Sequence, residues 1–300
     1  MKSIRYLPLL LCACVGQALA DTPINLTHAA SATARVNISN VAGSVNVVAW
    51  DRNEVQVVGQ LGDGSKPLAI TGSNTDMTVK VEPAGGSGWL NWTGDRKLSP
   101  STLELHVPKS ASLIINVVSS PVVIDDMAGG TIEISTVSGR SRISANTPSL
   151  KVDSVSGNIE IAGSAQTANL QTVSGDILAP ALGSAVRLQT ISGHIQAGGG
   201  PWQTLTLSTV SGDVQLAGNL APNGSVGIDS MSGDVQLQLP ATLSGLLHAS
   251  SFSGELRSDF GTPTKPEHGP GSSLDVHLGN GGGKINVETF SGDLRIRKQN

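Results

Sequence analysis

One short motif recurs at nearly regular intervals through the second half of this 300-residue chain. Its clearest copy is Thr172-Val173-Ser174-Gly175-Asp176-Ile177. The eight copies have glycines at 139, 157, 175, 193, 212, 233, 254 and 292, so the steps between them are 18, 18, 18, 19, 21, 21 and 38 residues. A fixed period near 20 residues is typical of a solenoid, in which each repeat forms one coil that packs on its neighbours. The motif therefore predicts a rod of stacked coils.

The apolar residues of each copy occupy fixed positions around the motif glycine. Counted from that glycine they stand at −7, −5, −2, +2 and +4, as do Leu150, Val152, Val155, Ile159 and Ile161 around Gly157. Residues two apart on a strand face the same side of a sheet. This period of two, with no convincing helical period, predicts an all-β fold. We expect a single-stranded β-helix with coils of 18–21 residues.

The apolar pattern changes phase between −5 and −2. In a continuous strand that change would move half of the apolar residues to the solvent side. We therefore expect a bend between −3 and −2 that turns the −2 residues into the interior. The interior ladder expected at −2 is Val137, Val155, Val173, Ile191, Val210, Met231, Phe252 and Phe290. A ladder of Thr and Ser is expected beside it at −3, from Thr136 to Thr289.

The same template fits further upstream, with Ser120 or Gly43 in the place of the motif glycine. We expect a β-rich segment or cap at residues 21–110, with a candidate diverged first coil around Gly43. The repeat domain is expected at 111–300, with an inserted loop at 261–283 that begins rich in Pro and Gly. Basic residues near the end, Arg295, Arg297 and Lys298, are expected to protect the open edge of the last coil from aggregation.

Residues 1–20 have the composition of a secretory signal peptide. Lys2 and Arg5 precede an apolar stretch at 7–14, and Ala18-Leu19-Ala20 form a small-residue cleavage site. No later stretch approaches the ~20 apolar residues of a membrane-spanning helix. We therefore expect an exported chain, located in the periplasm, at the cell surface or in the extracellular space.

Both cysteines, Cys12 and Cys14, lie in this leader. A lipidated Cys14 is the weaker alternative, because the alanine site competes with it. Without the leader, 17 basic and 23 acidic residues remain, which gives a net charge of −6. The chain has no basic patch with interleaved aromatic residues, which argues against a nucleic-acid partner. The six histidines show no metal-ligand spacing, and we expect no cofactor.

The serial Thr-Val-Ser-Gly-Asp copies, with Asn280-Gly281-Gly282-Gly283-Lys284-Ile285 before the last one, resemble the bacterial putative-adhesin family of exported β-helix domains of unknown function. The resemblance covers roughly residues 33–298. It implies the β-helix fold and supplies no catalytic residues. It also implies that some relatives act in envelope-stress regulation.

The position after each motif glycine forms a partly acidic column. Its members are Arg140, Asn158, Asp176, His194, Asp213, Asp234, Glu255 and Asp293. Hard cations such as Ca²⁺ bind several oxygen ligands, so Asp176, Asp213, Asp234 and Glu255 are candidates for weak cation binding. We favour turn chemistry instead, in which each Asp or Asn bonds its own neighbouring backbone, because Arg140 and His194 interrupt the column.

Trp89 and Trp92 lie in an expected loop at 83–102. They could form a partner surface that stacks on a sugar or contacts a membrane. The favoured alternative is a hydrophobic cap over the open end of the solenoid. A third tryptophan, Trp202, is expected to pack at a coil corner.

Some parallel β-helices cleave polysaccharides, which raises the question of an enzyme. The candidates are Asp125, Asp126, His194 and Arg295, but they belong to coils too far apart to converge on one bond. The sequence therefore predicts a non-enzymatic exported β-solenoid that presents a repetitive polar surface to an envelope protein or glycan, in an adhesin-like or structural role. The alternatives are an envelope-stress sensory or regulatory module and, third, a polysaccharide-active enzyme.

Overall fold

The computed structural model of this chain describes residues 22–84, 99–267 and 270–299. The expected leader at 1–20 and the segment that carries Trp89 and Trp92 lie outside these ranges, so those expectations stay untested. Within the described ranges the chain forms strands and no helix.

The N-terminal strands are β1 (Thr22–Ala29), β2 (Arg35–Trp50), β3 (Glu54–Leu61), β4 (Ile70–Gly72), β5 (Asp76–Lys80), β6 (Ser101–Pro108), β7 (Ser112–Ser119), β8 (Val122–Ala128) and β9 (Ile132–Ser138). The middle strands are β10 (Ser141–Ser156), β11 (Ile159–Ile161), β12 (Ser164–Ser174), β13 (Ile177–Ser192), β14 (Ile195–Ser211) and β15 (Val214–Ser232). The C-terminal strands are β16 (Val235–Pro240), β17 (Gly245–Ser253), β18 (Leu256–Ser258), β19 (Ser272–Leu278), β20 (Gly283–Ser291) and β21 (Leu294–Gln299).

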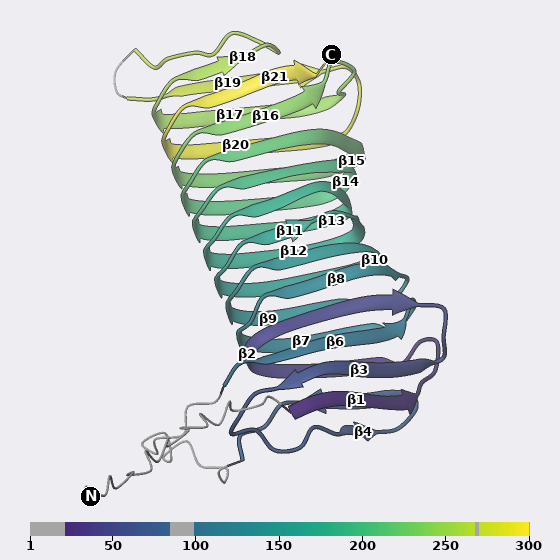
Figure 1. Cartoon of the computed structure of the whole chain (residues 1–300). Coiled ribbons are helices and arrows are strands. Elements are labelled where there is room, and N and C mark those ends of the chain that lie inside the picture. Colours follow the sequence, from purple (N-terminus) through teal and green to yellow (C-terminus); the bar gives the residue numbers. More distant parts are fainter. Residues whose placement is uncertain (1–21, 85–98, 268–269, 300) are drawn as a thin grey trace, which may run out of the picture.

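The strands wind into a rod of stacked coils (Figure 1), which confirms the predicted all-β solenoid. Neighbouring coils pair in parallel, so equivalent residues of the repeat stand side by side. Leu170 of β12, for example, pairs with Leu188 of β13, and Leu188 pairs with Leu207 of β14. One apolar core, built from residues at −7, −5, +2 and +4, runs through the rod.

The structure corrects the predicted phase of each coil. In the strand before the corner the buried positions are −7, −5 and −3, as in Leu205, Leu207 and Thr209, which are at most 5% exposed. The −2 residue Val210 is instead 48% exposed. The predicted interior ladder at −2 is therefore wrong, and so is the predicted bend between −3 and −2. The alternation continues to −3, and the chain turns at Ser-Gly.

Small hydroxyl side chains fill the interior at −3, and some of them bond to the backbone of the corner. Ser154 Oγ donates to the carbonyl of Gly157 at 3.4 Å, and Ser251 Oγ donates to that of Gly292 at 3.3 Å. A small polar residue thus replaces the aliphatic residue that the sequence pattern placed there. The aliphatic residue at −2 is turned outward as a consequence.

The N-terminal segment continues the solenoid. Strand β2 pairs in parallel with β7 before its corner at Gly43 and with β8 after it. On its other side β2 also pairs in parallel, with β5 and β6. Only beyond these strands does the pairing become antiparallel, with β3 on β6 and β1 on β3.

The coils at the C-terminal end do not follow sequence order. Strand β20 lies between β15 and β17, and β21 lies between β16 and β18 (Figure 1). After β16 the chain skips one position along the rod and forms β17. It then turns back through β19, which is antiparallel to β17, and β20 fills the position left open between β15 and β17. Strand β21 pairs with β16 along its length and with β18 at Leu294–Ile296, so Arg295 does not lie on an open edge, contrary to the expectation.

We number the ten coils along the rod by their corner residues. From the N-terminal end these are Gly43, Ser120, Gly139, Gly157, Gly175, Gly193, Gly212, Gly233, Gly292 and Gly254.

Candidate functional site: an exposed apolar stripe

The most unusual surface of this molecule is a continuous row of large apolar side chains on the outside of the rod. Each coil contributes its −2 residue, and each of these residues is between 39% and 58% exposed. In the order of coils 1 to 10 this apolar stripe consists of Val41, Val118, Val137, Val155, Val173, Ile191, Val210, Met231, Phe290 and Phe252. Single exposed apolar residues are ordinary, but a contiguous exposed patch marks an interaction surface.

The stripe lies on a sheet face that is otherwise polar. The column beside it, at −4, points to the same side because the two positions are two residues apart on a strand. From coil 1 to coil 10 this column consists of Ser39, Asn116, Ser135, Asp153, Gln171, Gln189, Ser208, Asp229, Glu288 and Ser250. The apolar surface is thus one residue wide and ten coils long.

A groove of about 770 Å³ follows the stripe over its C-terminal half. Its lining includes Ile191, Val210, Met231 and the two phenylalanines. The segment before β19 borders the groove at the end of the rod through Lys265 and Pro266. A smaller hollow of about 330 Å³ lies on the same stripe around Val118, Val137 and Val155. Both hollows belong to one surface.

The two phenylalanines stack on each other at the end of the stripe. The ring centroids of Phe252 and Phe290 are 4.8 Å apart and the ring planes differ by 9°. Their coils are neighbours only because β20 is inserted beside β17. The unexpected order of the last coils therefore gives the stripe its largest apolar element.

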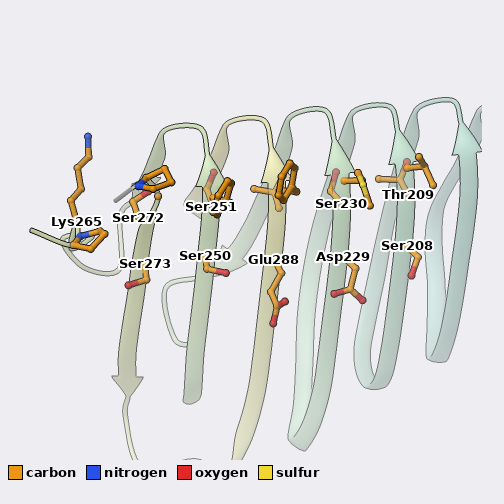
Figure 2. A pocket seen from close by; sticks show the side chains of 18 of the residues that line it. Ser208, Thr209, Asp229, Ser230, Ser250, Ser251, Lys265, Ser272, Ser273 and Glu288 are labelled. Carbon is orange, nitrogen blue, oxygen red and sulfur yellow. The ribbon is translucent and has the colours of Figure 1, made fainter. Parts of the chain in front are cut away.

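Two carboxylates stand beside the stripe in the C-terminal half. Asp229 and Glu288 are register partners on β15 and β20 (Figure 2). Partial burial, and after it the negative charge of Glu288, raise the pKa of Asp229 above its ordinary value of 3.8. This edge of the groove is therefore acidic and partly desolvated.

The predicted acidic column lies at +1, on the far side of the Ser-Gly corner from the stripe. Its side chains bond to the next coil, which differs from the expected bonding to their own backbone. Asp176 Oδ1 accepts a hydrogen bond from the backbone N–H of His194 at 2.9 Å, and Asp213 Oδ1 accepts one from that of Asp234 at 2.9 Å. The ladder continues through Asp234 and Asp293 to the N–H of Glu255.

These bonds leave the four cation candidates without a shared site. Asp176, Asp213 and Asp234 each use one carboxylate oxygen to accept a backbone hydrogen bond from the next coil. Glu255 instead pairs with Arg257 at 2.6 Å, and the hydrogen bond from that guanidinium lowers its pKa. Within the described residues, no three His, Cys, Asp or Glu side chains are grouped closely enough to hold a metal ion.

The residues considered for polysaccharide cleavage are not brought together. Asp125 lies on β8 in coil 2, His194 follows the corner of coil 6, and Arg295 lies on β21 in coil 9. Arg295 is instead 3.4 Å from Asp293 of its own coil. Trp202 is fully buried, and its indole fills the space that a side chain on Gly218 would need.

Sequence reasoning missed the apolar stripe because it placed the −2 residues inside. One signal could have revealed it. If Thr and Ser are accepted as interior residues, then −7, −5 and −3 form an unbroken alternation and −2 must face outward.

The sequence profile of one protein family matches residues 33–297, which is most of this chain. The chain belongs to the Toastrack DUF4097 family. This membership confirms the predicted family resemblance, which covers nearly the same residues. No curated protein matches this Toastrack chain.

One solved structure shares the fold, and a second one is similar over most of this chain. The structure of a putative lipid binding protein from Parabacteroides distasonis is 14% identical, with 93% of this chain and 97% of that chain covered and a TM-score of 0.51. The structure of a putative adhesin from Bacteroides fragilis is 13% identical, with 93% and 98% covered and a TM-score of 0.48. In the described part of this Toastrack protein, no helix is long and apolar enough to cross a bilayer.

Proposed function

We propose that this Toastrack protein is a non-enzymatic, exported binding module of the cell envelope, with an adhesin-like or structural role, and that it engages its partner along the apolar stripe. The observation that carries this proposal is the unbroken row of ten half-exposed apolar side chains from Val41 to Phe252. Binding modules commonly bury such exposed apolar surface when the partner docks.

The shape of the stripe supports an elongated partner. Ten coils at ~4.8 Å per step give a surface about 45 Å long, which is too extended for a compact small molecule. The polar −4 column beside it fits the usual interface pattern of an apolar centre with a polar rim. The repeat pattern predicted a polar binding surface, whereas the surface proposed here is centred on the apolar stripe.

The name of one structural neighbour, a putative lipid binding protein, supports a binding role. The dispersed positions of Asp125, His194 and Arg295 support the absence of catalysis, because groups that act on one bond must lie together.

The test measures retention of the purified, tagged protein on envelopes from cells that produce it. Val173→Asp places a charge in the middle of the stripe, and we expect retention to fall at least about tenfold, as for a charge buried without a partner. The matched control is Leu178→Asp, because Leu178 is 41% exposed but lies away from the stripe. Equal retention of both variants and the wild type, or robust cleavage of polysaccharides by the pure protein, would contradict the proposal.

A further inference from the structure

The side chains of the apolar stripe grow larger from one end to the other. Coils 1 to 5 carry Val, whereas coils 8 to 10 carry Met231, Phe290 and Phe252. A partner with a flat surface would contact the Met and Phe side chains and leave a gap over the shorter valines. A partner whose own side chains shrink in the opposite direction would meet the stripe at a constant distance.

We propose that this partner is a second copy of the chain, packed face to face on the apolar stripe with the two rods antiparallel. The proposal rests on the proposed function and names the partner of that same surface. A two-fold axis parallel to the strands places coil 1 of one copy against coil 10 of the other and superposes the two stripes. The interface is then isologous and closes at two copies.

Each large side chain of the stripe then faces a small one. The pairs across the interface are Val41 with Phe252, Val118 with Phe290, Val137 with Met231, Val155 with Val210, and Val173 with Ile191. This pairing distributes side-chain volume more evenly along the interface than a parallel pair does, which suits the close packing of interfaces. A parallel pair would oppose Phe with Phe and Val with Val, which leaves a gap at one end.

The polar column beside the stripe is also compatible with the antiparallel pair. The pairs at −4 become Ser39 with Ser250, Asn116 with Glu288, Ser135 with Asp229, Asp153 with Ser208, and Gln171 with Gln189. All three carboxylates of this column therefore face a neutral hydrogen-bonding group, and no two like charges are directly opposed. Like charges held opposite each other across such a face would destabilise it.

The size of this face matches a stable dimer. Its length of about 45 Å, for ten coils, and a width of about 17 Å, for residues −6 to −1 of each coil, give roughly 750 Å² per copy. A standard specific interface buries ~800 Å² per partner. A bilayer surface is a poorer occupant, because the −4 carboxylates Asp153, Asp229 and Glu288 lie beside the stripe and would repel anionic headgroups.

The first test is sedimentation equilibrium of the full chain over a concentration series. We expect a monomer–dimer equilibrium for the wild type. Val173 and Ile191 meet at the two-fold axis, so Val173→Asp buries two carboxylates per dimer and should raise the dissociation constant at least about 100-fold. Leu178→Asp should change it less than about threefold, since it removes only exposed surface elsewhere. A wild type that stays monomeric, or a dimer that Val173→Asp leaves intact, would overturn the proposal.

The second test determines the direction of the rods by disulfide cross-linking. Val137→Cys and Met231→Cys are made separately in a chain whose Cys12 and Cys14 are changed to serine. The antiparallel pair predicts a cross-linked dimer when the two variants are mixed and none with either variant alone. Cross-linking of Val137→Cys with itself would contradict the antiparallel arrangement and indicate a parallel one.

The two proposals fail in different ways. If the chain is monomeric but Val173→Asp still abolishes envelope binding, self-association is overturned and the proposed function stands. If Val173→Asp dissociates the dimer while envelope binding is unchanged, self-association stands and the proposed function fails.

Discussion

A Cβ atom on Gly212 would lie 2.0 Å from the carbonyl oxygen of Gly193 in the preceding coil. Gly212 also has a φ of +146°, which side chains rarely adopt. Gly212→Ala should therefore lower the free energy of unfolding by about 2–4 kcal/mol, from backbone strain and overpacking together. Urea unfolding followed by circular dichroism would measure this loss.

Gly227 provides the control for this substitution. It lies on β15, and a Cβ there would meet no atom within 4 Å. Gly227→Ala should leave stability within about 1 kcal/mol of the wild type or raise it slightly, because alanine restricts the unfolded chain. Equal effects of the two alanines would show that the corner glycines are not selected by contact between coils.

The buried hydroxyls at −3 give a second prediction. Thr209 is 5% exposed, and its Oγ1 has no hydrogen-bond partner in the described structure. Thr209→Val keeps the shape and removes a desolvated polar atom, so stability should stay level or rise by about 1 kcal/mol. Thr147→Val is the comparison, because Thr147 Oγ1 donates to the carbonyl of Ser149 at 3.0 Å. That variant should lose about 1–2 kcal/mol in thermal or urea unfolding.

Asp229 should make stability depend on pH. Burial and Glu288 raise its pKa in the folded state above the 3.8 of the free side chain. As the pH rises past 3.8, the Asp229 carboxyl ionises first in the unfolded chain. Asp229 therefore destabilises the fold increasingly, until its carboxyl also ionises in the folded state. Asp229→Asn should therefore gain stability relative to the wild type between about pH 3 and pH 7. A constant difference across this range, measured by urea unfolding at each pH, would contradict the assigned cause.

The +1 column gives a prediction about cations. Asp213 Oδ1 accepts the backbone N–H of Asp234, and an amide oxygen can accept the same bond. Asp213→Asn should therefore be as stable as the wild type or slightly more stable, since it also removes a neighbouring like charge. Calcium at about 1 mM, which saturates ordinary extracellular sites, should shift the melting temperatures of both proteins equally. A shift confined to the wild type would support cation binding instead.

Much of the architecture could be predicted because the repeat itself specifies it. The columns at −7, −5, +2 and +4 are interior, as expected, and the coil around Gly43 pairs with the next ones as the template requires. The error concerned a single position. Val173 is more hydrophobic than Thr172, so the pattern favoured Val173 as the interior residue. The strand alternation decides instead, because it continues to Thr172, whose Oγ1 is buried without a hydrogen-bond partner in the described structure, and it turns Val173 outward.

The stripe and the coil order could not be predicted for related reasons. The position of the −2 residues depends on where the corner lies, which periodicity alone does not determine. The insertion of β20 between β15 and β17 depends on which edge the chain meets after β19, a non-local choice. Both features together create the stacked pair of Phe252 and Phe290.

Thiol labelling of two adjacent residues tests the central claim most directly. Val173→Cys and Thr172→Cys are made separately in the chain that lacks Cys12 and Cys14, and reaction with a maleimide is followed across a dilution series. Val173 is 42% exposed and Thr172 is 4% exposed, so Val173→Cys should react rapidly in dilute protein and more slowly as the concentration rises and the stripe is covered. Thr172→Cys should react slowly at every concentration. Rapid labelling of Thr172→Cys, with Val173→Cys protected at every dilution, would show that the stripe is interior and would contradict the account.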